Sequence, residues 1–175
     1  MTNVTNNRDI CHLPQNSLTF IIGLGNTLQS DEGLGVYAMQ ALETALGSPD
    51  GLEFIDGGVL GLNLLPWVEE ASHLLLLDAA DAGQPAGTVI ELRRDEIPLY
   101  TGMKMSQHQV TFQEVLGLAE IRGNLPPKLH LIGAQPADLS VGVGLSNRVS
   151  AVIPEIVRRA AAILQEWHLI SPLSP

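Results

Sequence analysis

The fold is decided by the stretch HLLLLDAADAG, residues 73–83. Its first five residues form a continuous run without polar alternation, which is typical of a strand buried on both faces of a parallel sheet. Asp78 follows this run at its carboxyl end. In open α/β sheets ligands bind outside that edge, so Asp78 is a candidate site residue, with a loop-capping aspartate as the ordinary alternative. Asp81 is typical of a turn.

Strands and helices alternate on both sides of this stretch. Helical spacing of apolar residues predicts helices over 34–46, up to Glu70, over 110–121 and over the final segment that contains Pro154. Only residues 79–87 separate the third strand from the fourth, too few for a helical crossover, so the fourth strand is expected to run antiparallel. Strands are predicted over residues 18–24, 52–55, 73–77, 88–92 and 129–132.

This order of elements predicts an α/β fold. We expect a three-layer, doubly wound, mostly parallel five-stranded sheet with one antiparallel strand and helices on both faces. A single domain is predicted over 18–170, with a polar tail at 1–17 and a short tail at 171–175. A chain of 175 residues is long enough to bury a substantial core.

Helix-end chemistry gives two local predictions. An N-cap at Asn63 would place Pro66 in the first turn of its helix, where amide donors are free. Ser30 or Asp31 is expected to cap the helix that follows them, and the helix dipole favours Glu32 at that point. The sequence leaves Glu32 equally open to a role in a site.

Composition narrows the class of partner. The formal net charge is −10, from 9 Lys+Arg against 19 Asp+Glu, which opposes binding to nucleic acid or to an anionic membrane. Cys11 is the only cysteine, so an intramolecular disulfide and a thiolate metal site are excluded. The start of the chain lacks the pattern of a signal peptide, and no apolar run is long enough to span a bilayer. We therefore expect a cytoplasmic protein without membrane insertion.

The segment GLGNTL, residues 23–28, begins like a dinucleotide-binding fingerprint. Leu28 stands where that motif needs its third glycine, which disfavours nucleotide binding. Peptidyl-tRNA hydrolases also open with Gly-Leu-Gly-Asn after a strand. Their histidine context and basic surface are missing here, which disfavours that class as well.

Glu32, Asp78 and His108 together suggest a metal site. Each stands where an apolar run gives way to polar or glycine residues, and two carboxylates with one imidazole suit a borderline divalent ion such as Ni²⁺ or Zn²⁺. His108 begins a helix, whose positive end disfavours the imidazolium form and keeps the ring able to bind metal. Taken singly, each has an ordinary structural explanation. Structural roles are predicted for the other four histidines, which are His12, His73, His130 and His168.

Five segments in this order resemble the nickel-iron hydrogenase maturation endopeptidases. They are GLGNTLQSDEGLG (23–35), IDGG (55–58), LLLLDAADAG (74–83), MSQHQVTFQEVLGLAE (105–120) and LHLIGAQP (129–136). The residues around His108 are most similar to the uptake or membrane-bound branch. The resemblance implies an aspartic-type hydrolase that removes the C-terminal extension of the hydrogenase large-subunit precursor after nickel insertion.

The resemblance also implies roles for particular residues. Glu32, Asp78 and His108 match the family's metal-contacting positions, and the Asp56-Gly57-Gly58 segment matches a motif tied to substrate fit. Nickel is then presented by the precursor, and another divalent cation can occupy the site in isolation. The attacking water is either metal-bound or activated by a carboxylate, with Asp78 the preferred base.

Two other functions fit the sequence. One is a non-proteolytic, metal-sensing binding module or chaperone for the hydrogenase large subunit. The other is a metal-dependent hydrolase of small molecules, which would act without a large protein partner.

Overall fold

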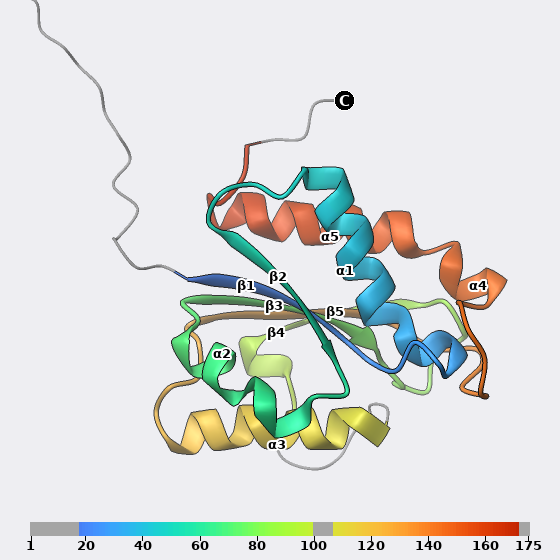
Figure 1. The fold of residues 1–175 in the computed structure, drawn as a ribbon, viewed down its shortest axis with the longest axis horizontal. Coiled ribbons are helices and arrows are strands. Elements are labelled where there is room, and N and C mark those ends of the chain that lie inside the picture. The colour runs from blue at the N-terminus through green and yellow to red at the C-terminus, as the bar shows by residue number, and fades with distance from the viewer. Residues whose placement is uncertain (1–17, 100–106, 172–175) are drawn as a thin grey trace, which may run out of the picture.

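The computed structural model describes residues 18–99 and 107–171, with the main chain alone described at 107–111. Its centre is one five-stranded sheet in the order β2-β1-β3-β5-β4 (Figure 1). Neighbouring strands are parallel except β4, which runs antiparallel to β5. The strands are β1 (Thr19–Leu24), β2 (Leu52–Gly58), β3 (His73–Ala79), β4 (Val89–Arg93) and β5 (Lys128–Ala134). The predicted sheet, including its single reversed strand, is confirmed.

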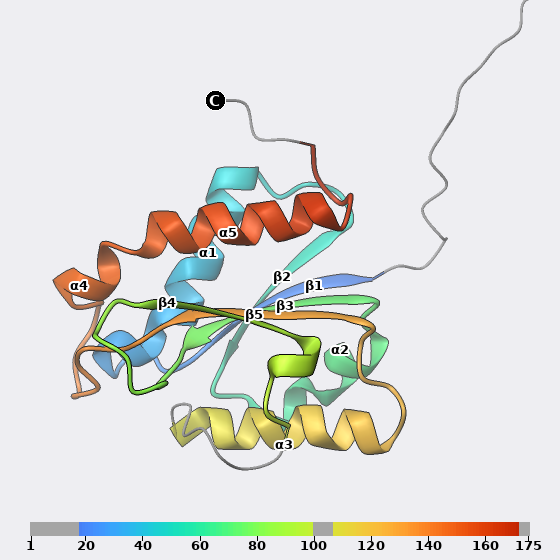
Figure 2. The ribbon, with the colours of Figure 1, turned by 180° about the vertical axis from the view of Figure 1, so that it is seen from behind.

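Helices cover both faces of the sheet. Figures 1 and 2 show α1, α4 and α5 on one face and α2 and α3 on the other, which confirms the three layers. Figure 2 also shows β4 at the edge of the sheet. The helices are η1 (Ser30–Gly33), α1 (Leu34–Leu46), η2 (Gly61–Leu64), α2 (Leu65–Glu70), η3 (Arg94–Glu96), α3 (Gln107–Ile121), α4 (Asn147–Ser150) and α5 (Ile153–Glu166).

The leucine run of β3 serves both hydrophobic layers. Leu75 and Leu77 belong to the core cluster beneath α1 and α5, and Leu74 and Leu76 belong to the cluster beneath α2 and α3. All four side chains are fully buried. Because successive strand residues point to opposite faces, a strand covered on both faces needs an unbroken apolar run.

Several boundaries differ from the predictions. β2 continues through Asp56 to Gly58, because these residues still pair with the end of β1 across a register shift. Asn63 is not a cap: it lies in η2, and α2 then begins at Leu65 without a side-chain cap. Pro66 does lie in the first turn, as predicted.

The final helical segment consists of two helices. Ser146 caps α4 through its hydroxyl, and α5 begins at Ile153 with Pro154 in its first turn. The predicted tail at 1–17 lies outside the described residues, as does most of 171–175. No helix in the described ranges is long and apolar enough to cross a membrane.

Candidate functional site

The carboxyl ends of four parallel strands meet at one edge of the sheet. In the strand register, Gly23 of β1 lies between Asp56 of β2 and Leu77 of β3. Asp78, the next residue, pairs with Gly133 of β5. This register gathers the polar residues that follow the apolar runs at the edge where open α/β sheets bind ligands.

Asp78 is the penultimate residue of β3, and only 1% of its surface is exposed. Its Oδ1 accepts a hydrogen bond from the Ala79 amide at 2.7 Å. Gly133 is in close contact with it, because a Cβ at that position would clash with the Asp78 carbonyl oxygen. The main chain of Asp78 is therefore fixed against the neighbouring strand β5, and the buried carboxylate extends from a strand rather than from a loop.

Glu32 lies in η1 and is 4% exposed. Two glycines make its position possible. Gly25 has a positive φ of 110°, and a Cβ there would clash with the Glu32 carbonyl oxygen. A Cβ on Gly35 would clash with the carbonyl oxygens of Leu24 and Leu77. The start of α1 therefore packs directly on the ends of β1 and β3, and η1 contacts β3, which brings Glu32 to the same edge as Asp78.

Asp31 has a different role from the predicted N-cap, since η1 and α1 have no side-chain cap. Its fully buried carboxylate binds the loop after β5. The amides of Ala137 and Asp138 donate to Oδ2 at 2.8 and 2.9 Å, and the Ser146 amide donates to Oδ1 at 2.7 Å. These donors come from a segment more than 100 residues away, so local sequence could not indicate them.

His108 lies in the first turn of α3, as the sequence predicted from the pattern around it. Figure 1 shows that α3 begins at the side of the molecule where β1 and β3 end. The His108 side chain is outside the described part of the structure. Among the side chains that are described, no three His, Cys, Asp or Glu residues form a group able to hold a metal ion. The predicted trio therefore stays a prediction, with two of its three side chains placed at one edge.

The Asp56-Gly57-Gly58 segment ends β2 beside Gly23. Asp56 is exposed. A Cβ on Gly57 would lie 2.6 Å from the Ile22 Cγ2 atom, and the Gly58 carbonyl accepts a hydrogen bond from the Gly25 amide at 3.0 Å. Packing within the sheet accounts for Gly57, and the positive φ of 39° at Gly58 favours glycine there. The predicted contribution of this segment to substrate fit stays a prediction.

Gln135 is a residue that the sequence reading missed. It follows β5 and is buried, and its Oε1 accepts hydrogen bonds from the amides of Ala82 and Gln84 at 2.9 and 3.1 Å. Its Nε2 donates to Asp81 Oδ1 at 3.1 Å. Asp81 also accepts from the Gly83 amide at 3.2 Å, which confirms its turn role. Gln135 therefore fixes the loop that follows Asp78. A polar residue directly after a buried strand was the available signal.

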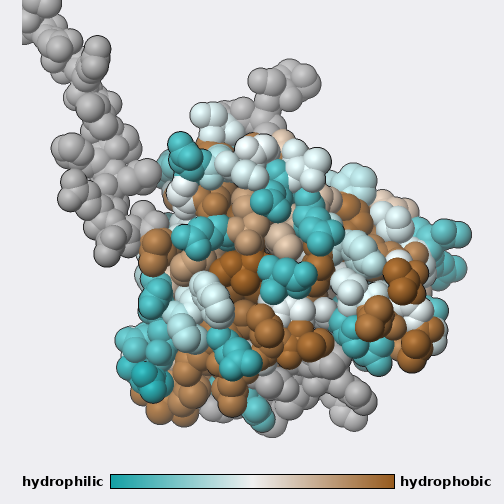
Figure 3. Space-filling model, viewed as in Figure 1, coloured by the Kyte–Doolittle hydropathy of each residue, from teal (hydrophilic) through white to brown (hydrophobic). Residues whose placement is uncertain are grey.

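Exposed apolar side chains surround this edge. One set, here called the loop patch, lies on the segment before η1 and on the loop after β5, which pair at Gln29 and Gly142. A second set lies between β2 and α2. Figure 3 shows brown residues gathered over both regions. The loop patch is Leu28, Leu139, Val141 and Val143, and the second set is Val59, Leu60 and Leu62.

Comparison with known proteins decides the family. The family model described as "Hydrogenase maturation protease" matches residues 36–163. The chain belongs to the hydrogenase maturation protease family. Hydrogenase expression/formation protein HupD of Rhizobium leguminosarum bv. viciae is 42% identical over 157 residues, covering 89% of this chain and 78% of that protein. The hydrogenase 2 maturation protease of Escherichia coli K12 is 36% identical over 147 residues, covering 83% and 90%.

Solved structures agree with this membership. The hydrogenase maturating endopeptidase HybD from E. coli superposes with a TM-score of 0.77 at 33% identity, covering 85% of this chain and 93% of that one. The resemblance seen in the sequence, with its placement among uptake-type enzymes, is therefore confirmed, and the chain is a peptidase of the hydrogenase maturation class.

Proposed function

We propose that this chain is an endopeptidase that removes the C-terminal extension of the nickel-iron hydrogenase large-subunit precursor after nickel insertion. Nickel is carried by the precursor and is recognised by Glu32, Asp78 and His108. The observation that carries the proposal is the burial of two carboxylates, Glu32 and Asp78, at the carboxyl edge of the sheet in a chain of the maturation protease family.

The donor set suits this task. Two carboxylate oxygens and one imidazole nitrogen are acceptable ligands for a borderline divalent ion, and three protein ligands leave positions for ligands from the precursor. The rigid contacts of Gly25, Gly35 and Gly133 keep the Glu32 and Asp78 main chains fixed, so little ordering is needed when the metal arrives. The nickel ion would have a second role if it polarised the scissile carbonyl or activated the attacking water. Asp78 is the preferred general base for that water.

The surroundings of the site support a large protein substrate. The loop patch and the second apolar set expose seven large apolar side chains around one edge, and their exposed fractions reach 88% at Val141 and 81% at Val143. Exposed apolar surface beside a site is typical of protein contacts. A hydrolase of small molecules would have no need of it.

The testing experiment is a purified reaction of this protein with the large-subunit precursor, scored by mass spectrometry for loss of the C-terminal extension. The precursor is supplied with nickel and without it. We expect cleavage of the nickel-loaded form alone, and we expect His108→Ala to abolish it while the circular dichroism spectrum is unchanged.

Three other outcomes of this experiment would each contradict part of the proposal. Cleavage of nickel-free precursor at the same rate would remove nickel recognition. Stable binding of loaded precursor without any loss of mass would instead identify a metal-sensing binding module or chaperone. Full activity in His108→Ala would overturn the assigned trio.

A further inference from the structure

A polar cavity lies at the opposite edge of the sheet from Glu32 and Asp78. It has a volume of about 270 Å³, just below the range of pockets that hold drug-sized ligands. Because β4 is antiparallel, its last residues lie beside the first residues of β5 at this edge. The lining residues come from β4, η3, β5 and the end of α5, and they are Arg93, Arg94, Asp95, Pro127, Lys128, Leu129, His130, Glu166 and Trp167.

Strand register directs basic side chains toward the same face. Arg93 of β4 pairs with His130 of β5, and Lys128 of β5 pairs with His73 of β3. Paired residues, and residues two apart on one strand, share a face of the sheet. Trp167 at the end of α5 covers this face, with its ring centroid 5.5 Å from that of His130 and 5.2 Å from that of His73.

His130 is the group that points to a ligand. It is 7% exposed and lines the cavity, and neither ring nitrogen has a hydrogen-bond partner among the described residues. A buried polar group without a partner is costly, so such groups are usually satisfied by protein, water or ligand. By contrast, the neighbouring His73 has a contact from its Nδ1 to the Ser72 hydroxyl at 2.9 Å.

The charges around His130 are unusual for this chain. Three of its nine Lys and Arg residues line this one cavity, in a protein of net charge −10. Arg94 already binds Glu120 at 3.1 Å and the Pro126 carbonyl at 3.2 Å. Neither the Arg93 guanidinium nor the Lys128 ammonium forms an ion pair within the described part of the chain.

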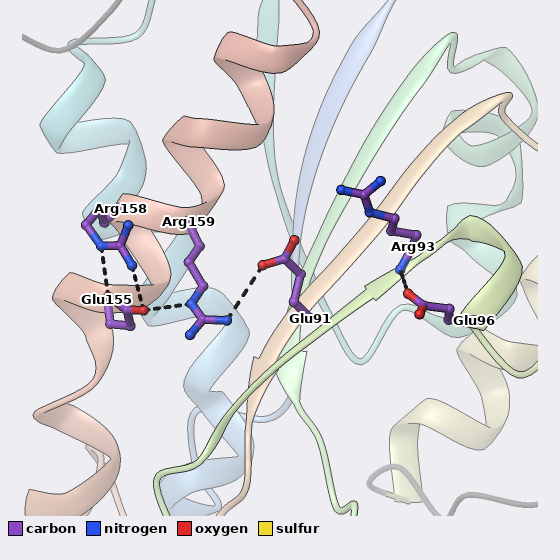
Figure 4. A network of polar contacts seen from close by, with 6 residues as sticks. All are labelled: Glu91, Arg93, Glu96, Glu155, Arg158 and Arg159. Carbon is purple, nitrogen blue, oxygen red and sulfur yellow. Dashed lines mark hydrogen bonds and ion pairs between the residues drawn. The ribbon is translucent and has the colours of Figure 1, made fainter.

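Figure 4 shows why Arg93 is available. The dashed line from Glu96 ends on its main-chain nitrogen, and the guanidinium extends away from Glu96. The nearby Glu91 forms an ion pair with Arg159 at 3.7 Å. Arg159 also binds Glu155 at 2.7 Å. The two acidic side chains that line the cavity, Asp95 and Glu166, are exposed to solvent.

We propose that this cavity binds a small oxyanion, a carboxylate or a phosphate, held by Arg93 and Lys128 and by a ring N–H of His130. The anion neutralises the two cations and satisfies the buried imidazole, while Trp167 forms an apolar wall. The site lies outside the peptidase site and does not depend on the function proposed for that site.

The test is a titration of the full-length protein followed by NMR of the histidine Cε1–H signals. Sodium phosphate, sodium acetate and sodium chloride are the probes, at constant ionic strength and pH. We expect a saturable shift of the His130 signal with phosphate or acetate and none with chloride, and the tighter of the two identifies the ligand as phosphate-like or carboxylate-like. Lys128→Gln, at an exposed position, is expected to weaken binding by about five-fold.

Arg158→Gln is the matched control, because Arg158 is exposed on α5 and does not line the cavity. It removes the same charge and is expected to leave the affinity unchanged. Equal shifts with chloride, or no saturable shift with either oxyanion, would overturn the proposal. Equal weakening by Lys128→Gln and Arg158→Gln would also overturn it, because it would reduce the effect to net charge.

Discussion

The carboxylate of Asp31 binds Ser146, a residue 115 positions further along the chain, through both the main-chain amide at 2.7 Å and the hydroxyl at 2.9 Å. It also accepts hydrogen bonds from the amides of Ala137 and Asp138, so it satisfies four donors in the segment that carries Val141 and Val143. A buried carboxylate that ties a loop to the start of η1 couples the position of that loop to the position of Glu32, the next residue.

The first prediction concerns this contact. Asp31→Ala removes a fully buried carboxylate that accepts four hydrogen bonds, so we expect the free energy of unfolding to fall by about 3 kcal/mol. Asp31→Asn retains one oxygen acceptor, so its free energy of unfolding should fall by less. Urea denaturation monitored by circular dichroism measures both, and exposed Asp50→Ala is the control, expected to change stability by less than about 0.5 kcal/mol. A loss in Asp31→Ala no larger than that of the control would contradict the structural role.

A second prediction concerns the two buried carboxylates. Glu32→Gln and Asp78→Asn keep the size of each side chain and remove its charge, so the fold should persist while cleavage of nickel-loaded precursor falls about 100-fold or more. Glu53→Gln, at an exposed position in β2, should cleave normally. Mass spectrometry of the released extension gives the rates. Retained cleavage in both site variants would exclude these carboxylates from the reaction.

Much of the fold could be predicted because its signals are local. The apolar run of β3 indicates a strand that is covered by helices on both faces. The short connection to β4 requires β4 to run antiparallel. The metal-site prediction rested on the same logic, since Glu32 and Asp78 both follow apolar runs and both lie at one edge. The Asp31 contacts could not be predicted, because their donors are remote in sequence and three of them are main-chain amides.

The polar cavity beside His130 illustrates the same limit. The sequence predicts a structural role for His130, because nothing near it in the sequence indicates a site. Arg93 reaches it only through the antiparallel register of β4 and β5, and Trp167 only through the packing of α5. A cluster made by register and helix packing leaves no spacing pattern in the chain, so only the assembled sheet shows it.

The third prediction tests the glycine contacts beneath η1. In Gly35→Ala the new methyl group would clash with the carbonyl oxygens of Leu24 and Leu77, so the start of α1 must shift away from β3. We expect a loss of about 3 kcal/mol in stability and a larger loss of cleavage than stability alone explains, because Glu32 moves with η1. Assays below the unfolding transition separate the two effects.

Gly47→Ala is the control for that experiment. Gly47 ends α1 in the left-handed conformation with φ of 69°, and no atom lies within 4 Å of an added Cβ. It should cost about 1 kcal/mol and leave cleavage unchanged. If both alanine variants retained cleavage equally, the contact of Gly35 would not determine the position of Glu32.

A fourth prediction concerns substrate contact. Val141→Ser combined with Val143→Ser removes the most exposed part of the loop patch, so we expect KM for the precursor to rise several-fold while kcat and stability are retained. Ile121→Ser is the matched control, since Ile121 is 72% exposed at the end of α3. Steady-state cleavage of the precursor measures both constants. An equal rise in KM with the control would remove any specific role of the patch.

The last prediction is a pH dependence of stability. Burial lowers the pKa of His130, helped by the nearby Arg93, and burial together with Lys128 lowers the pKa of His73, each from an ordinary value of 6.5. Between the folded pKa values and 6.5 the unfolded chain binds more protons than the folded chain. The free energy of unfolding should therefore fall as pH drops through 6.5 and level off below the folded pKa values.

Urea denaturation at several pH values from about 7.5 down to about 5.5, above the range in which ordinary carboxylates titrate, isolates the histidines. His130→Gln should give a shallower slope than the native chain, because one of the two groups with a lowered pKa is gone. His168→Gln, at an exposed position after α5, is the control for loss of a histidine outside the cavity, and the difference between the two variants measures the contribution of His130. Glu91, Glu166 and Glu96 act in the opposite direction on the pKa of His130 and so limit the size of the effect, but burial and Arg93 together outweigh them. Parallel curves for the native chain and His130→Gln would mean that this imidazole titrates alike in the folded and unfolded states. That outcome would contradict the burial of the ring beneath Trp167.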